Sequence, residues 1–328
     1  FMMPTAQRRL VFLLLALLSA ASVLAAAAIG SVSMGWEQWW AALTGPASES
    51  GELVWRLRLP RAAAAWTVGA LLSLSGCLMQ VLLRNPLADP YILGVSGGAS
   101  FAALCGMSAG VAAALSPALA WAGALVSILI VFGLARGEGP WSGTRLLLTG
   151  VVTASGWAAL ISLLLTLGPD GSLRGMLFWL LGDLSYAQLP WWALFILIVI
   201  FIVCFGMARS LNVLAMGETT ARLLGEPTRK LLWAIYLLAS VLTATAVSIA
   251  GNIGFVGLIV PHLMRLLVGS DHRVLLPASA MFGGLFLVFS DTLARTVLAP
   301  RQLPVGVVTA LLGVPLFLLL LNRARVKQ

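Results

Sequence analysis

The chain has 328 residues, of which 60% are hydrophobic and only 9% are charged, and its formal net charge is +9. Its mean hydropathy is +1.02. Soluble proteins carry about 25% charged residues, so one water-soluble core could not hide this much apolar surface. The basic residues form no stripe with interleaved aromatic residues, which excludes nucleic-acid binding as the meaning of the charge. The composition predicts an all-α protein that crosses a lipid bilayer many times.

The first apolar run covers residues 10–30 and follows Arg8 and Arg9. Such a start resembles a signal peptide, but the run is longer than the usual apolar region of about 7–15 residues. Similar runs recur along the chain. We therefore predict that this segment is a transmembrane helix.

Charged residues, glycines and prolines divide the apolar sequence into ten predicted transmembrane helices. Two are less regular, because the third and fourth are separated only by Ser116-Pro117 and the eighth is short and contains Pro261. A further apolar stretch, 172–184, is too short to span and is expected to lie at a membrane interface. The ten ranges are 10–30, 61–83, 92–115, 117–135, 144–167, 190–208, 230–250, 255–268, 275–297 and 305–322.

The basic residues indicate the orientation, because cytoplasmic loops of membrane proteins are enriched in Lys and Arg. With the N-terminus in the cytoplasm, 14 basic residues lie on the cytoplasmic side and 6 on the other, which accounts for all 20. We expect both termini in the cytoplasm and one transmembrane domain over 1–328. The longest polar connections, an external loop at 31–60 and a cytoplasmic segment at 209–229, are too short for a soluble domain. The six external exceptions are Arg56, Arg58, Arg61, Arg174, Arg295 and Arg301.

Two prolines interrupt the chain after the second predicted helix. Pro86 and Pro90 prevent a continuous helix, and Asp89 between them is costly at membrane depth unless it is paired or hydrated. The simplest interpretation is a tight cytoplasmic turn that leads into the glycine-rich stretch 94–99 and a packed helix. A functional loop is the alternative.

The segment 211–227 connects the sixth and seventh predicted helices. Glu218, Ala221, Arg222 and Gly225 follow helical spacing, and Gly225 with Pro227 is typical of a helix end. We predict one short amphipathic helix on the cytoplasmic face. It is either a surface connector or a docking helix that receives force from a partner.

Glycines and Pro261 interrupt the apolar segment 251–265. A broken helix of this kind is tolerated only where it packs against protein or lines a cavity. His262 within it is interpreted as a structural hydrogen-bonding group. Near the external side, Asp291 and Arg295 are one helical turn apart and are expected to pair. The external arginines either reach to the interface with their aliphatic stems or bind an acidic partner.

Several catalytic signatures are missing from the sequence. The two lysines, Lys230 and Lys327, neither follow Gly nor precede Ser or Thr, so the chain has no phosphate-binding P-loop. There is no HExxH pair and no Gly-x-Ser-x-Gly motif with a plausible histidine partner. The cysteines have no metal-ligand spacing and are interpreted as packing residues. No catalytic or metal site is predicted.

Several long segments resemble the FecCD family, the permease subunits of type II ABC importers for vitamin B12, haem and ferric siderophores. The resemblance runs from about residue 50 to the C-terminus and implies ten helices per subunit, a pathway between two copies of the chain, and two cytoplasmic ATPase subunits. The matching stretches, in the family's order, are LRLPR (57–61), RNPLADPYILGVSGGAS (84–100), TRLLLTG (144–150), GETTARLLGEP (217–227), GNIGFVGLIVPHLMRLLVGSDHRVLLP (251–277) and LPVGVVTALLGVP (303–315).

The resemblance also assigns roles to individual residues. It implies cytoplasmic gates at Asn85, Leu87 and Thr144. It implies a coupling helix, received by a groove in the ATPase, at Gly217, Glu218, Ala221, Arg222 and Gly225. It implies that a periplasmic binding protein, through glutamates on its two lobes, docks on Arg58, Arg61 and Arg295, with Arg56 beside them.

For the substrate, the stretch RGMLFW (174–179) resembles haem-transporting members, and Arg174 near the periplasmic mouth could meet a haem propionate. Haem is therefore the expected transported ligand, with cobalamin or a ferric siderophore as alternatives. ATP would bind on the partner subunit, and the chain itself would hold no permanent cofactor. We expect the chain in the bacterial inner membrane. The rival from another class is an ion-coupled secondary transporter, which would normally place ionisable residues in mid-span.

Overall fold

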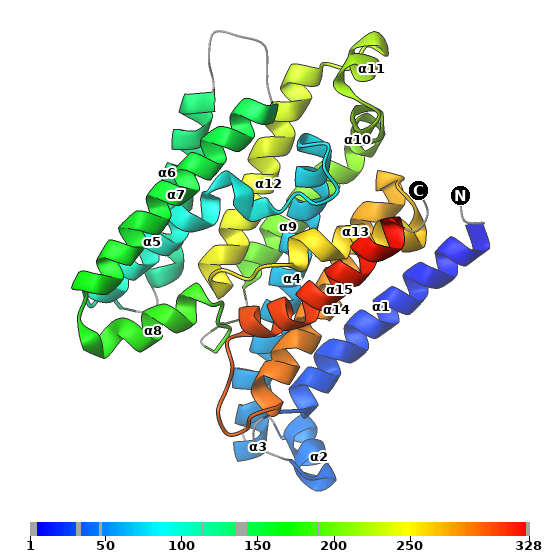
Figure 1. Ribbon diagram of the computed structural model, residues 1–328. Helices are drawn as coiled ribbons and strands as arrows, with labels where there is room; N and C mark the ends of the chain where they lie inside the picture. Colours follow the sequence, from blue (N-terminus) through cyan, green and yellow to red (C-terminus); the bar gives the residue numbers. More distant parts are fainter. Residues whose placement is uncertain are drawn as a thin grey trace.

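The computed structural model describes residues 5–30, 34–45, 48–112, 115–135, 143–185, 187–188 and 190–325, and the secondary structure of these residues is helical. Figure 1 shows α10 and α11 at one end of the molecule and α2 and α3 at the opposite end. The elements are α1 (Thr5–Ala28), α2 (Trp36–Thr44), α3 (Glu49–Glu52), the π-helical turn η1 (Leu53–Arg58), α4 (Leu59–Leu82), the 3-10 helix η2 (Pro90–Leu93), α5 (Val95–Ser108), α6 (Ser116–Ala135), α7 (Gly143–Leu167), α8 (Asp170–Leu180), α9 (Trp191–Gly206), α10 (Ala208–Ala215), α11 (Glu218–Leu223), α12 (Thr228–Ala250), α13 (Val256–Val268), α14 (His272–Thr296) and α15 (Val305–Arg325).

The prediction of an all-helical membrane fold is confirmed. Within the described residues, six helices are long and apolar enough to cross a bilayer, and a seventh span results if α9 and α10, which meet at 62°, are counted together. Three shorter apolar helices lie at 95–108, 256–268 and 305–320. Each of the ten predicted ranges overlaps one of the helices α1, α4, α5, α6, α7, α9, α12, α13, α14 and α15.

Helix α4 forms the centre of the molecule. It is almost completely buried, and α12, α13 and α14 pack around it. Small residues allow these helices to approach closely, as is common in membranes. A Cβ atom on Gly69 would overlap the backbone of Gly283 in α14, and one on Gly76 would overlap the carbonyl of Gly257 in α13.

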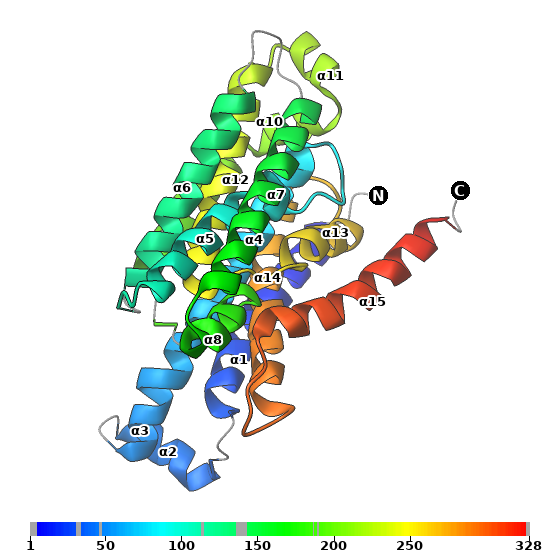
Figure 2. The same cartoon turned by 60° about the vertical axis from the view of Figure 1, so that its left-hand side comes forward.

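A second group of helices, α5, α6 and α7, packs beside α12. Here a Cβ on Gly98 of α5 would overlap the carbonyl of Gly123 in α6. The apolar stretch 172–184 is helical as far as Leu180, within the short helix α8. Figure 2 shows α15 projecting from the rest of the molecule, and Leu311, Leu318 and Leu319 on it are exposed.

The external loop predicted at 31–60 contains more regular structure than expected, although 31–33 and 46–47 lie outside the described residues. Helix α2 packs on α3, and the chain is helical from Glu49 through η1 into α4. The Ser48 hydroxyl caps α3 by accepting a hydrogen bond from the Gly51 amide at 3.0 Å. The Trp55 indole donates to the Ala42 carbonyl at 3.0 Å, which ties η1 to α2. The sequence here has no apolar periodicity that would predict helices, and the Ser48 cap and the Trp55 hydrogen bond stabilise them instead.

Candidate functional site

The loop after α4 carries two of the predicted gate residues. Asn85 is exposed, and its Oδ1 accepts a hydrogen bond from the Leu87 amide at 2.9 Å, which forms a local turn. Asp89 then caps η2, because its Oδ1 accepts from the Tyr91 amide at 2.8 Å. Burial raises the pKa of the Asp89 carboxyl to about 6, and the hydrogen bond from Tyr91 opposes that shift. The loop is therefore a tight turn followed by a capped helical turn.

The third gate candidate, Thr144, is exposed in the first turn of α7. In the described residues it makes no hydrogen bond with Asn85 or Leu87. The two elements meet farther along, where a Cβ on Gly150 of α7 would lie 2.8 Å from the Ile92 carbonyl oxygen of η2. The gate candidates thus lie on neighbouring elements that pack through η2.

The helix break predicted near residues 251–265 is confirmed at 251–255, between α12 and α13. Gly251 and Phe255 both have a positive φ, 67° and 71° respectively, which interrupts the helical path. Pro261 lies inside α13, and Gly76 packs against the Gly257 carbonyl that the missing proline amide leaves free. The Nδ1 of His262 is buried and makes no hydrogen bond among the described residues.

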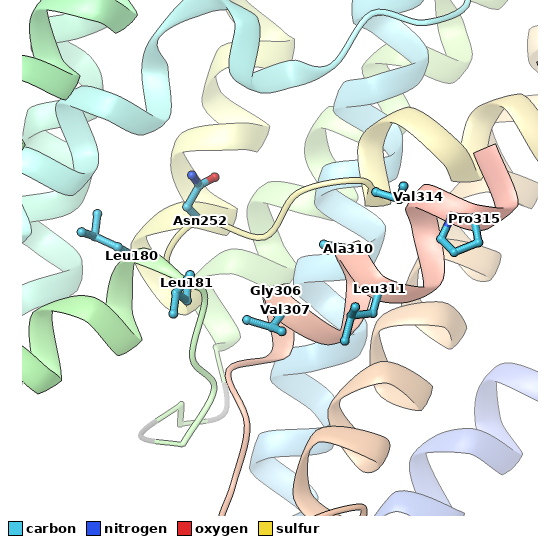
Figure 3. A pocket seen from close by; sticks show the side chains of 9 residues that line it. All are labelled: Leu180, Leu181, Asn252, Gly306, Val307, Ala310, Leu311, Val314 and Pro315. Atoms are coloured by element: carbon cyan, nitrogen blue, oxygen red, sulfur yellow. The ribbon is translucent and has the colours of Figure 1, made fainter. Parts of the chain in front are cut away.

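Asn252 of the interrupted segment lines a cavity of about 560 Å³, which is one of the two settings in which such a break is tolerated. Figure 3 shows this cavity between the end of α8, the 251–255 segment and α15. Its lining is apolar except for the amide of Asn252, whose Oδ1 makes no hydrogen bond to a described residue. The lining residues are Leu180, Leu181, Asn252, Gly306, Val307, Ala310, Leu311, Val314 and Pro315.

The single helix predicted at 211–227 is wrong, because the structure has two helices there, α10 and α11. Gly217 separates them with a φ of 122°, a conformation that L side chains rarely adopt. The predicted end is confirmed. The Gly225 amide bonds to the Arg222 carbonyl and the Glu226 amide to the Ala221 carbonyl, both at 3.0 Å, which is a Schellman motif.

On α11, the residues predicted for coupling lie partly against the rest of the protein and partly at its surface. Ala221 is fully buried, whereas Arg222 forms an ion pair with Glu218 and its Nε donates to the Thr228 hydroxyl at 3.2 Å. The apolar side chains at the outer end are free of the core, and Leu223 is 84% exposed. Together with Leu224 and Met216, it forms an exposed apolar tip.

The helix α10 is attached to α14 by residues that the sequence did not single out. Asn212 donates from Nδ2 to Asp271 Oδ1 at 2.8 Å, and its Oδ1 accepts from the His272 amide at 2.9 Å. These groups border a second cavity of about 630 Å³ that Arg84 and Arg265 also line. No sequence signal predicts this contact, since its partners are about 60 residues apart.

At the opposite end, Asp291 organises two of the four arginines predicted to dock a partner. Arg61 donates to its two carboxylate oxygens, from Nη2 at 2.8 Å and from Nε at 3.1 Å, and Arg295 Nε lies 3.0 Å from Oδ2. The Asp291 side chain is only 1% exposed. Arg61 Nη1 also donates to the Gln302 side chain at 2.8 Å. The predicted pairing of Asp291 with Arg295 is confirmed.

Arg58 and Arg295 hold the end of α1. Arg58 donates to the Ala28 carbonyl at 2.8 Å, and Arg295 donates to the Ala26 carbonyl at 3.2 Å. Cationic groups are favourable at this position, because the last carbonyls of a helix carry partial negative charge. Three of the four arginines are therefore buried between helices. Arg56 differs, because its side chain is 77% exposed and it pairs with Glu52 at 3.2 Å.

The candidate substrate residue, Arg174, lies on α8. It is exposed, and its guanidinium lies 5.7 Å from the centre of the Phe178 ring, one helical turn away. It is not among the residues that line the cavity in Figure 3.

Known proteins resemble this chain both in sequence and in the arrangement of its helices. The hemin transport permease HmuU of Yersinia pestis is 39% identical over 334 residues, which cover 97% of each chain. The cobalamin import permease BtuC of Halobacterium salinarum is 44% identical and covers 84% of this chain and 74% of its own. A solved structure, described as a metal-chelate type ABC transporter in an inward-facing conformation, has a TM-score of 0.83 at 29% identity and covers 96% of this chain and 99% of its own. The sequence matches the FecCD transport family over residues 14–323, and the chain therefore belongs to that family.

Proposed function

We propose that this chain is the membrane-spanning permease subunit of an ATP-driven importer in the bacterial inner membrane. Two copies would form the pathway, and two copies of a separate ATPase would supply the free energy. The chain would hydrolyse no ATP itself. The observation that carries the proposal is the match to a hemin transport permease along 97% of both chains. With the six long helices, the bent α9–α10 pair and the three shorter apolar helices would make up the ten spans of this proposal.

Haem is the substrate we propose, delivered by a periplasmic binding protein. The full-length match to the hemin permease and the exposed Arg174 on α8 support it. Cobalamin is the alternative, supported by relatives of 41–44% identity that are named for cobalamin or vitamin B12 import. A ferric siderophore is the second alternative substrate.

The two ends of the molecule would have different partners. The apolar tip of α10 and α11 is the proposed contact with the ATPase, because exposed leucines at an end of the molecule fit an apolar groove. At the other end, the four arginines remain the candidates for docking the binding protein. Arg56 supports this role most directly, since an incoming glutamate could reach it without opening a buried pair. Exposed ion pairs of this kind contribute to association rate and orientation more than to affinity.

Reconstitution tests the proposal. The chain and the ATPase encoded nearest to it are placed in proteoliposomes, and uptake of haem, cobalamin and a ferric siderophore is measured, each with its binding protein. We expect uptake of haem that requires ATP and stops when the P-loop lysine of the ATPase is replaced. Uptake of cobalamin or the siderophore alone would overturn the haem assignment.

The same liposomes distinguish the secondary-transporter alternative. The chain alone is tested with an imposed proton or sodium gradient and no ATPase. We expect no accumulation of substrate. Gradient-driven uptake by the chain alone would overturn the importer proposal as a whole.

A further inference from the structure

One side chain supplies both hydrogen bonds to a buried residue in the interrupted segment. The Tyr91 hydroxyl donates to the Ile253 carbonyl at 3.0 Å and accepts from the Ile253 amide at 3.1 Å. Ile253 is fully buried, so water does not reach these backbone groups as a substitute. A hydroxyl that bonds both groups of one residue takes the place of a missing helical partner.

The local backbone explains why a distant side chain is needed. The last hydrogen bond of α12 in this region joins the Gly251 amide to the Val247 carbonyl, and the first of α13 joins the Ile259 amide to the Phe255 carbonyl. Ile253 lies between these two ladders. Its partner comes from η2, 162 residues earlier in the chain.

The element that carries Tyr91 is held firmly on both sides. On one side, Pro90 sits against Gly257 of α13, where a Cβ atom would lie 2.6 Å from the proline ring. On the other side, Ile92 packs on Gly150 of α7, and the Ser127 hydroxyl of α6 donates to the Gly94 carbonyl at 2.8 Å. η2 is therefore a wedge between α13 and the α6–α7 pair, and it directly follows the gate candidates Asn85 and Leu87.

The segment that Tyr91 holds is also the wall of the cavity in Figure 3. Asn252, next to Ile253, lines that cavity together with Gly306 at the start of α15. The contact is tight, because a Cβ on Gly306 would lie 3.1 Å from the Asn252 carbonyl oxygen. A shift of η2 would thus move the cavity wall through one hydroxyl group.

We infer that Tyr91 is a positioning residue: its hydroxyl couples the gate loop 84–94 to the interrupted segment 251–255, so that gate and cavity change conformation together. The inference rests on the proposed function, because residues 84–94 act as a gate only if the chain is an importer permease. The coupling itself is a property of the isolated chain and is tested there first.

The test replaces Tyr91→Phe, which keeps the ring and removes only the hydroxyl. The reporter is Gly254→Cys, since a Cβ at that position meets no atom within 4 Å. Its reaction with N-ethylmaleimide is followed by mass spectrometry, which separates it from the native cysteines. The matched control is Tyr236→Phe, because the Tyr236 hydroxyl also donates to a buried backbone carbonyl, that of Ile128 at 3.2 Å, but away from the cavity.

We expect labelling of the Gly254→Cys reporter thiol to become at least about tenfold faster with Tyr91→Phe and to stay unchanged with Tyr236→Phe, as loss of a buried hydrogen bond would produce. Equal labelling with and without the Tyr91 hydroxyl would overturn the inference, and so would an equal increase in the control. Hydrogen exchange in the unmodified chain gives an independent check. The Ile253 amide should be as protected as those of α12, and rapid exchange there would also overturn the inference.

Transport distinguishes coupling from general stability. In the reconstituted complex, Tyr91→Phe should lower the number of substrate molecules imported per ATP hydrolysed, whereas Tyr236→Phe should not. An unchanged ratio would contradict the coupling role. If the unmodified complex imports nothing with ATP, the proposed function fails, while the labelling result still decides whether Tyr91 holds the 251–255 segment.

Discussion

At the scale of single residues, the least replaceable charge is the carboxylate of Asp291. It is buried and serves the guanidinium groups of Arg61 and Arg295 at once. The two arginines remain charged under all ordinary conditions, so removing the carboxylate leaves two buried cations without compensation. The cluster joins α4 to α14, and through Arg295 it reaches the end of α1.

Asp291→Asn should therefore destabilise the chain by about 3–5 kcal/mol, the usual cost of breaking a buried ion pair by removing one partner. Thermal unfolding in detergent measures it. The control is Glu52→Gln, which removes the exposed partner of Arg56 and should cost less than about 1 kcal/mol. Equal unfolding temperatures for the two variants would contradict the structural role of the cluster.

At the scale of helices, glycines decide which elements can touch. Gly76 of α4 has no room for a side chain against α13, whereas Gly133 in α6 has no atom within 4 Å of a would-be Cβ. The two glycines look alike in sequence, since both lie in apolar helices. Because their neighbours differ, replacing each by alanine should have opposite effects on stability.

Gly76→Ala should destabilise the chain by about 1–3 kcal/mol, because the added methyl group forces α4 and α13 apart. Gly133→Ala should be neutral or stabilise α6 by up to about 1 kcal/mol through its higher helix propensity. Unfolding of both variants in the same detergent compares them. A stable Gly76→Ala variant would mean that the α4–α13 contact is looser than described.

For α10 and α11 we predict a loss of binding and not of stability, because their exposed tip has no packing role inside the chain. Leu223→Ser should weaken association with the ATPase at least about tenfold, since fully burying a leucine side chain contributes about 1.5–3 kcal/mol. It should leave thermal stability unchanged. Leu129→Ser is the control, as Leu129 is 68% exposed on α6. Binding is measured by titration in nanodiscs, and equal losses for both variants would exclude α11 as the specific contact.

At the scale of the whole molecule, the charge distribution predicts which end faces the cytoplasm. A cysteine at Gly35, where a side chain has open space, should react from outside with a membrane-impermeant maleimide. A cysteine at Leu224, in the tip of α10 and α11, should react only after the membrane is opened. The reverse pattern in whole cells would invert the proposed orientation.

The sequence predicted the helices well because membrane helices satisfy their own backbone and are recognisable by the length of their apolar runs. It also predicted the break at 251–255 and the pairing of Asp291 with Arg295, since both depend on residues close along the chain. It did not predict the division of 211–227 into two helices. That depends on the backbone conformation of Gly217, whose φ of 122° cannot be read from the residues beside it.

By itself, then, the sequence determined membrane residence, the approximate helices and the FecCD resemblance, all of which rest on local composition and on motifs in order. The tertiary structure decided what the singled-out residues touch. It buried Arg58, Arg61 and Arg295 among helices and left Arg56 exposed, and it joined Tyr91 to Ile253 across 162 residues. The physical reason is that burial and long-range hydrogen bonds arise only when helices distant in sequence pack together.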